Sequence, residues 1–185
     1  SIVDIITGVL KSNDTNIMVD NKSIYHNLKG WQKLIGYVPQ KVMILNDTFK
    51  NNILYGLDED KFSDTEIIEL IKKMSLETLF NRLPSGLESK LDERGLNLSV
   101  GEIQRIGICR ALIYNPSILF LDEATSSLDT FTETQILEEL NLYKEKTLVS
   151  IAHRINSLRN CDTIYCIDNG KVIDQGSFSK YSIKN

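Results

Sequence analysis

A short apolar run that ends in two acids constrains the fold of this chain more than any other feature. Residues Ile118–Leu121 are all apolar, and Asp122 and Glu123 follow at once. An apolar run without alternation is typical of a strand that is buried on both faces, as in the middle of a parallel sheet. Such sheets bind their ligands beyond the carboxyl ends of the strands. The run therefore predicts an α/β fold that presents two carboxylates at that edge.

Other apolar segments predict the elements around this strand. Further strands are expected at Ile17–Val19, Leu34–Val38 and Thr147–Ile151, the last of them buried. Helices are expected at Ile2–Leu10, where the helix should be buried, after the Ser63–Glu66 capping box, at Glu102–Leu112 and at Glu133–Leu142. Asn169-Gly170 is a strong hairpin signal, and we expect the two flanking strands to add an antiparallel edge to the sheet.

Composition excludes several classes of protein. Hydrophobic residues make up 42% of the 185 residues and charged residues 25%, which is the balance of a globular core rather than of a disordered chain. The net charge of −4 argues against a nucleic-acid partner. No apolar run approaches the length of a membrane helix, so any work at a membrane needs a partner or a segment outside this sequence.

The three cysteines show no common metal-binding spacing. Their number is odd, and the two histidines are far from the C-x4-C pair of Cys161 and Cys166. Together with Cys109, they are expected to be core or half-buried thiols of a reducing compartment rather than zinc ligands.

Four short segments carry residues suited to phosphate chemistry, and each also has a structural reading. Asp122 and Glu123 could hold Mg²⁺ through water and activate an attacking water, or they could form an acidic turn. The segment from Ser99 to Glu102 could bind phosphate at a helix start, or Ser99 could be a plain N-cap. His153 and Gln40 each follow a predicted strand, and each alone would usually be structural.

Taken together and in this order, these segments resemble the nucleotide-binding domain of an ABC-type ATPase. The matching segments are Gln40 for the Q-loop, Leu98–Glu102 for the LSGGQ signature, Ile118–Asp122 for Walker B, Glu123 for the catalytic glutamate, Ser127–Asp129 for the D-loop and His153 for the switch histidine. The resemblance implies an α/β P-loop NTPase fold with a RecA-like, ABC-type core sheet. Residues 1–46 and 114–185 would form the core, and residues 47–113 an inserted helical signature subdomain.

The resemblance also implies a role for each residue at an ATP site. Asp122 would bind Mg²⁺ through water, and Glu123 would polarise the attacking water. His153 would contact the γ-phosphate of ATP. Gln40 would sense both Mg²⁺ and the nucleophile and would couple the site to a transmembrane transporter domain.

A second set of residues would serve a neighbouring subunit. In this family two nucleotide-binding domains pair head to tail around two ATP molecules. Ser99 and Gly101, with Glu102 beside them, would cap the γ-phosphate that is bound on the partner. Asp129 would lie at the seam between the two domains.

Two stretches resemble the exporter branch of the family. Residues Gln40–Ile53 follow the exporter pattern after the Q-loop, and Asp92–Gly95 resembles the X-loop that touches the cytoplasmic ends of membrane helices. Export of a lipid, oligosaccharide, peptide or drug-like substrate would fit. The chain would then work at the cytoplasmic face of the cell (inner) membrane, through a transmembrane domain that is not present in these 185 residues.

The signature departs from the family pattern, because it reads LSVGE. Val100 adds a branched side chain where backbone should approach phosphate, and Glu102 adds a negative charge. We expect a weakened signature, so that Val100→Gly should strengthen ATP-driven dimerisation of the complete domain. Equal dimer affinities of the native and Val100→Gly forms, measured by analytical ultracentrifugation, would contradict this expectation.

The Walker A motif, G-x4-G-K-[ST], has no match in this sequence. The only Gly-Lys pair is Gly170-Lys171, near the opposite end. In the family the helix that resembles Ile2–Leu10 follows the Walker A loop directly, so the sequence is expected to begin just after that loop and to cover part of the domain. Three hypotheses stay open: the ATPase end of an exporter, a non-catalytic interaction subunit that supplies only its signature face, and a remnant that does not fold stably.

Overall fold

The computed structural model describes residues 2–11, 16–91 and 98–182 of the chain. The α-helices are α1 (Ile2–Ile6), α2 (Leu28–Lys33), α3 (Phe49–Ile53), α4 (Asp64–Lys73), α5 (Glu77–Arg82), α6 (Val100–Leu112), α7 (Thr130–Asn141) and α8 (Phe178–Ser182). The strands are β1 (Met18–Val19), β2 (Lys22–Ser23), β3 (Ile35–Val38), β4 (Asp47–Thr48), β5 (Lys90–Leu91), β6 (Ile118–Asp122), β7 (Thr147–Ile151), β8 (Ile164–Asp168) and β9 (Lys171–Gly176). Short 3-10 turns lie at Ile24–His26, Glu59–Lys61, Gly86–Glu88 and Ile155–Leu158.

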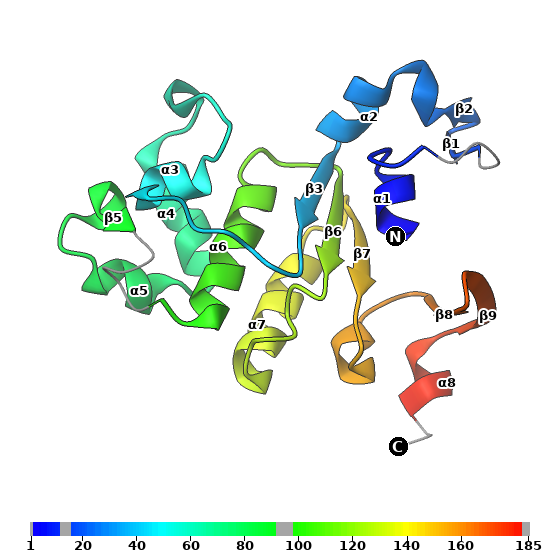
Figure 1. The fold of residues 1–185 in the computed structure, drawn as a ribbon. Helices are drawn as coiled ribbons and strands as arrows, with labels where there is room; N and C mark the ends of the chain where they lie inside the picture. The colour runs from blue at the N-terminus through cyan, green and yellow to red at the C-terminus, as the bar shows by residue number, and fades with distance from the viewer. Residues whose placement is uncertain (1, 12–15, 92–97, 183–185) are drawn as a thin grey trace.

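A parallel sheet of three strands, in the order β3-β6-β7, lies at the centre of the molecule (Figure 1). In its register, Gly36 of β3 is opposite Leu119, and Leu121 is opposite Ser150 of β7. The apolar run at Ile118–Leu121 is thus the middle strand, as the sequence predicts. Helix α7 connects β6 to β7, which is the crossover that parallel neighbours require.

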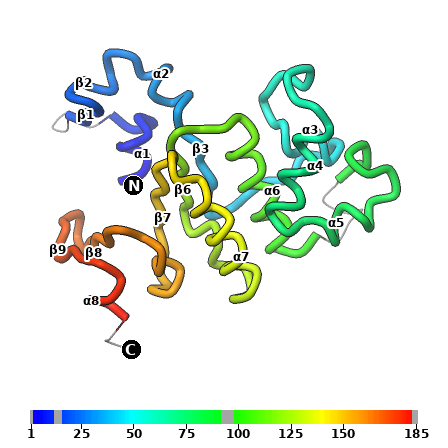
Figure 2. The backbone as a smooth tube through the Cα atoms, turned by 180° about the vertical axis from the view of Figure 1, so that it is seen from behind, coloured from blue at the N-terminus to red at the C-terminus, as the bar shows by residue number. Residues whose placement is uncertain are grey.

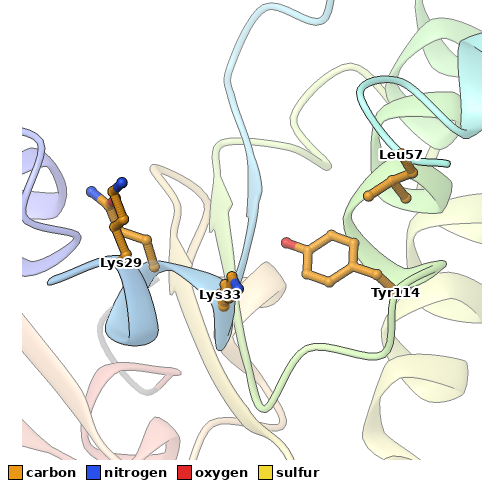
Figure 3. Close-up of a pocket in the computed structure, with 5 residues that line it drawn as sticks. Lys29, Lys33, Leu57 and Tyr114 are labelled. Atoms are coloured by element: carbon orange, nitrogen blue, oxygen red, sulfur yellow. The ribbon is translucent and has the colours of Figure 1, made fainter. Parts of the chain in front are cut away.

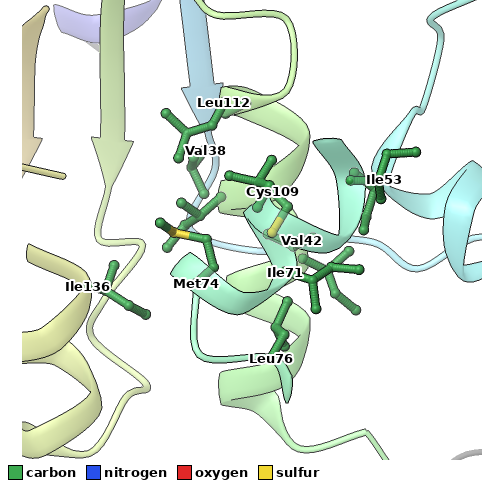
Figure 4. Close-up of a cluster of buried hydrophobic side chains, with 14 of the residues drawn as sticks. Val38, Val42, Ile53, Ile71, Met74, Leu76, Cys109, Leu112 and Ile136 are labelled. Atoms are coloured by element: carbon green, nitrogen blue, oxygen red, sulfur yellow. The ribbon is translucent and has the colours of Figure 1, made fainter. Parts of the chain in front are cut away.

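Side chains of β6 are buried on both faces of this sheet. Leu119 and Leu121 belong to a large apolar cluster that α3, α4, α6 and α7 share, part of which Figure 4 shows around Cys109. Phe120 points to the other face, where it packs with Val3 of α1 and Trp31 of α2. Successive residues of a strand point to alternate faces. Because both faces of β6 are covered, every residue of the run has to be apolar.

The first helix is shorter than the sequence predicts. Helix α1 ends at Ile6, and Gly8 follows with a left-handed φ of 74°. A residue in that conformation ends a helix, and glycine adopts it without steric cost. Val9 and Leu10 are therefore exposed, at 69% and 50%, and the prediction of a buried helix through Leu10 was wrong.

Two predictions about the edge of the sheet were also wrong. Strand β7 is only half-buried, because β6 is its only strand neighbour among the described residues. The hairpin of β8 and β9 forms a separate two-stranded sheet and adds no edge to the central one. Its turn is as predicted, since Asn169 and Gly170 have positive φ values of 47° and 74°.

Helices α3 to α5 gather at one end of the molecule, away from the β8–β9 hairpin (Figure 2). Helix α4 begins at the predicted capping box, in which Ser63 and Glu66 satisfy each other's backbone N–H groups. Along its length Ile67, Leu70 and Ile71 face the core. None of the described helices is long and apolar enough to cross a bilayer.

We predict that the Cys109 thiol is inert in the folded chain and makes stability fall at alkaline pH. Cys109 is fully buried, and burial raises the pKa of its thiol to about 12, from 9.0. Above pH 9 the unfolded chain releases this proton while the folded chain keeps it, so folding stability falls by about 1.4 kcal/mol per pH unit until the folded pKa is reached.

The measurement is urea unfolding at pH 8 and pH 10 for the native chain and Cys109→Ala. The native chain should lose about 1.4 kcal/mol more than the variant between these pH values. Equal losses would contradict the prediction, as would rapid reaction of the native Cys109 with a thiol reagent.

Candidate active site

Four of the predicted site residues meet at the carboxyl edge of the central sheet. Gln40 follows β3, Asp122 ends β6, Glu123 comes directly after it, and His153 follows β7. Because the three strands are parallel, their carboxyl ends lie side by side. The fold therefore brings together residues that are up to 113 positions apart. This is as expected, because each of them was predicted to stand at the carboxyl end of a strand.

Glu123 is the centre of this group. Its Oε2 atom accepts a hydrogen bond of 2.8 Å from the side-chain Nε2 of Gln40. Its Oε1 atom lies 2.9 Å from Nε2 of His153. The glutamate side chain is 19% exposed and the histidine 83% exposed, so the carboxylate is held between two side chains and still reaches solvent. Such a carboxylate is positioned to accept a proton from a bound water.

The backbone at Glu123 is unusual. Its φ of 51° lies in the left-handed region, which costs a residue other than glycine about 1 kcal/mol or more. The N–H of Glu123 donates to the carbonyl of Ile151 in β7, at 3.0 Å, and this bond holds the turn in place. Strain of this kind persists where the surrounding structure imposes it, and it is common at active sites.

Asp122 has a partner that the sequence analysis missed. The hydroxyl of Tyr37, one strand away on β3, donates to Oδ2 of Asp122 at 2.9 Å. Partial burial, and then this bond to a carboxylate, raise the pKa of Tyr37 to about 12, so that it remains a neutral donor. No pattern in the sequence signalled this pairing, because Tyr37 lies on the same face of β3 as the buried Ile35 and reaches Asp122 only through the parallel register of β3 with β6.

The oxygen donors at this edge suit Mg²⁺. Asp122 supplies a carboxylate, and the amide of Gln40 supplies an oxygen. Among the residues that the structure describes, no cluster of three or more acidic, histidine or cysteine side chains could hold a metal alone. Mg²⁺ is usually bound by one or two carboxylates together with waters and substrate phosphates, and Asp122 could supply such a carboxylate.

Ser99 and Glu102 form the N-terminal cap of α6. Glu102 N–H donates to Ser99 Oγ at 3.2 Å, and Ser99 N–H donates to Glu102 Oε2 at 2.7 Å. Arg82 of α5 also donates to Glu102 Oε1 at 2.9 Å. The charge of Glu102, buried to 8% exposure, thus has a partner that the sequence analysis did not foresee. Val100, the first residue of the helix, is 65% exposed.

The start of α6 at Gly101 lies beside the side chain of Leu128, which precedes Asp129 at the start of α7. A methyl group on Gly101 would stand 3.2 Å from Leu128, the residue before Asp129. Asp129 is the N-cap of α7, and its carboxylate accepts from the N–H of Thr132 at 3.0 Å, which holds its pKa below the usual range. No hydrogen bond or ion pair within the described ranges joins Ser99, Gly101, Glu102 or Asp129 to the group around Glu123.

The segment after Gln40 is fastened to the helices by three residues that the sequence analysis missed. Gln104 of α6, 3% exposed, donates from Nε2 to the Gln40 carbonyl at 3.1 Å. Asn52 of α3 is fully buried and exchanges hydrogen bonds with the backbone of Leu45. Arg110 of α6 donates to the carbonyl of Met43 at 2.6 Å and to Asn52 Oδ1 at 2.8 Å. The polar side chains themselves are visible in the sequence, but the burial of Gln104 and Asn52 is not, because it depends on how the helices pack.

A pocket of about 430 Å³ lies elsewhere and is not part of this group. Lys29, Gln32, Lys33, Leu57 and Tyr114 line it. In Figure 3 the hydroxyl of Tyr114 points toward α2, and it donates to the carbonyl of Ile35, the first residue of β3. The pocket thus lies at the amino end of that strand, opposite the edge that carries Gln40.

The segment that resembles the X-loop, Asp92–Gly95, lies outside the described residues.

Comparisons with known proteins agree with this geometry. The sequence profile of the ABC transporter family matches residues 1–126. A putative export ATP-binding/permease protein of Rickettsia typhi is 40% identical over 179 residues, which cover 96% of this chain and 31% of that protein. An ATM1-type heavy metal exporter of Novosphingobium aromaticivorans is 40% identical over 163 residues, which cover 87% of this chain and 26% of that protein.

A solved structure is also similar over nearly the whole chain. It is a bacterial Atm1-family ABC exporter with ATP bound, and it superposes with a TM-score of 0.89 and 36% identity over 99% of this chain and 32% of its own. The chain covers between 26% and 32% of the length of these three relatives. The fold is the α/β fold of P-loop NTPases. The order of the motifs, the parallel sheet and the profile match all agree, and this chain belongs to the ABC transporter family.

Proposed function

We propose that this chain is the ATP-hydrolysing part of an ABC exporter and that it couples ATP hydrolysis to export through a transmembrane domain. The observation that carries the proposal is the position of Glu123, whose carboxylate lies between Gln40 and His153 beside Asp122. The family binds ATP, and the relatives are named as exporters.

In this proposal Glu123 takes a proton from water as the water oxygen forms a bond to the γ-phosphorus of ATP. The bond from that phosphorus to the bridging oxygen breaks, and ADP leaves with the electron pair. Gln40 and His153 hold the carboxylate toward the water, and His153, which is largely exposed, can reach the γ-phosphate. Asp122 and Gln40 would hold Mg²⁺, which offsets negative charge on the phosphates when it is bound.

A second nucleotide-binding domain, paired head to tail, is the proposed partner for a second group of residues. Ser99, Gly101, Glu102 and Asp129 would face the nucleotide of that domain or lie at the seam. The exposed apolar side chains beside them, Val100 and Phe131 at 65% and 72%, support an interface there.

The transmembrane domain is the proposed partner for the segment after Gln40. Met43 and Tyr55 are 73% and 63% exposed, close to the hydrogen bonds that fasten this segment to α3 and α6. This contact would place the chain at the cytoplasmic face of the cell (inner) membrane. We also propose that residues 1–46 and 114–185 form the RecA-like core and residues 47–113 the helical signature subdomain. The position of α3 to α5 at one end of the molecule supports this division (Figure 1).

The test compares two polypeptides. One is the 185-residue chain, and the other carries a strand and a G-x4-G-K-[ST] loop joined in front of residue 1, the arrangement in which P-loop proteins bind phosphates. We expect Mg-ATP binding and phosphate release from the joined form alone, measured by titration calorimetry and a phosphate assay. Micromolar binding by the 185-residue chain would contradict the need for that loop. A joined form that binds ATP and releases no phosphate would favour a non-catalytic interaction subunit.

A further inference from the structure

A buried carboxylate on α7 ties together the two loops that carry Glu123 and His153. Glu133 is 7% exposed, and its Oε1 atom accepts two hydrogen bonds of 2.7 Å, one from the hydroxyl of Thr125 and one from the hydroxyl of Ser157. Thr125 is two residues after Glu123, and Ser157 is four residues after His153. Both hydroxyl-bearing residues are themselves buried.

The position of Glu133 on its helix would suit an apolar residue. Ile136 and Leu140 follow it on the same buried side of α7 and belong to the main apolar cluster. A buried carboxylate there is costly unless its oxygens have partners. The two hydroxyls supply them at Oε1, and Arg154, directly after His153, lies 3.8 Å from Oε2.

We propose that Glu133 is a positioning residue, which holds the loop after β6 and the loop after β7 in the relative positions that bring His153 to Glu123. The proposal rests on the proposed role of Glu123 and His153 at the ATP site. Each loop also has a local backbone hydrogen bond between residues three positions apart. In the first loop Ser126 N–H donates to the Glu123 carbonyl, and in the second Ser157 N–H donates to the Arg154 carbonyl. Glu133 comes from a third element, α7, and its side chain contacts both loops. Its loss should therefore weaken the contact of His153 with Glu123 while each loop keeps its local turns.

The experiment follows the Hε1 resonance of His153 by NMR in the 185-residue chain at a single pH and without nucleotide. The chain has only two histidines, and the variant His26→Gln assigns the signal of His153. The variant Glu123→Gln marks where that signal lies when the carboxylate beside the ring is lost. Glu133→Ala removes the shared acceptor and should move the His153 signal most of the way toward the Glu123→Gln position. Ser157→Ala removes one of the two bonds and should move it in the same direction.

Two control variants separate positioning from a merely structural role. Glu133→Gln keeps an oxygen that can accept from both hydroxyls, so the His153 signal should stay near its native position. Glu138→Ala removes an exposed acid from the same helix and should leave the signal unchanged.

The proposal is overturned if the His153 signal stays in place in a folded Glu133→Ala chain. If that variant does not fold, an unchanged signal in Ser157→Ala overturns it. It is also overturned if Glu133→Gln or Glu138→Ala moves the signal as far as Glu133→Ala does. Because the sample contains no ATP, these outcomes are independent of whether the joined polypeptide hydrolyses ATP.

Discussion

Replacing Glu123 with glutamine should lower the rate of ATP hydrolysis by about 10²–10⁴-fold in the polypeptide that carries a joined P-loop. Glutamine has nearly the same size, so it can fill the place between Gln40 and His153, but its amide cannot accept a proton from water. Binding of Mg-ATP should be retained, because phosphate contacts belong mainly to the P-loop. The expected signature is a loss in kcat with little change in KM.

The matched control for this prediction is Glu138→Gln. Glu138 is an exposed acid on α7, and within the described part of the chain no hydrogen bond or ion pair joins it to the site, so its variant should hydrolyse ATP at the parent rate. A Glu123→Gln form that is as fast as its parent would show that another group activates the water. Phosphate release in single-turnover experiments separates this effect from slow product release.

Replacing Asn52 with alanine should cause the largest loss of stability among single polar substitutions, about 3 kcal/mol. The Asn52 side chain is fully buried, accepts from Leu45 N–H at 2.8 Å and donates to the carbonyls of Leu45 and Thr48 at 3.0 Å. It also accepts from the guanidinium of Arg110. Alanine would leave these buried groups without their partner, and each such group costs about 1–3 kcal/mol.

Urea unfolding measures this loss, and the neighbouring Asn51→Ala is the matched control. Asn51 is only partly buried, and its side chain makes one hydrogen bond, of 3.1 Å, to Asp47. Its replacement should cost about 1 kcal/mol or less. If the two variants unfold at the same urea concentration, the contacts of Asn52 do not hold the segment after Gln40.

Much of the local structure could be predicted from short stretches of sequence. The apolar run at Ile118–Leu121 predicted the central strand, and the capping box at Ser63 predicted the start of α4. These features depend on residues that are neighbours along the chain, so the local sequence is sufficient to predict them. Helix α1 failed the same reasoning because Gly8, rather than the apolar spacing, decides where the helix ends.

Burial could not be predicted in the same way. Thr147–Ile151 reads as a buried strand, yet its exposure depends on what lies beside it, and in the described structure its only strand neighbour is β6. The hairpin at Asn169 forms where it was predicted along the chain, because its turn depends on local residues. The prediction that it joins the central sheet was wrong, because such pairing depends on residues far apart in the sequence.

By itself, the sequence determined which residues stand at the carboxyl ends of the strands, and so which side chains could share a site. Only the tertiary structure decided how they meet. Gln40 and Glu123 are 83 residues apart, and Tyr37 and Asp122 are 85 apart. The bonds of Glu133 to Thr125 and Ser157 likewise depend on how α7 packs against the ends of β6 and β7. Hydrogen bonds form only between atoms about 3 Å apart, and packing of the whole chain, rather than any local pattern, brings these atoms to that distance.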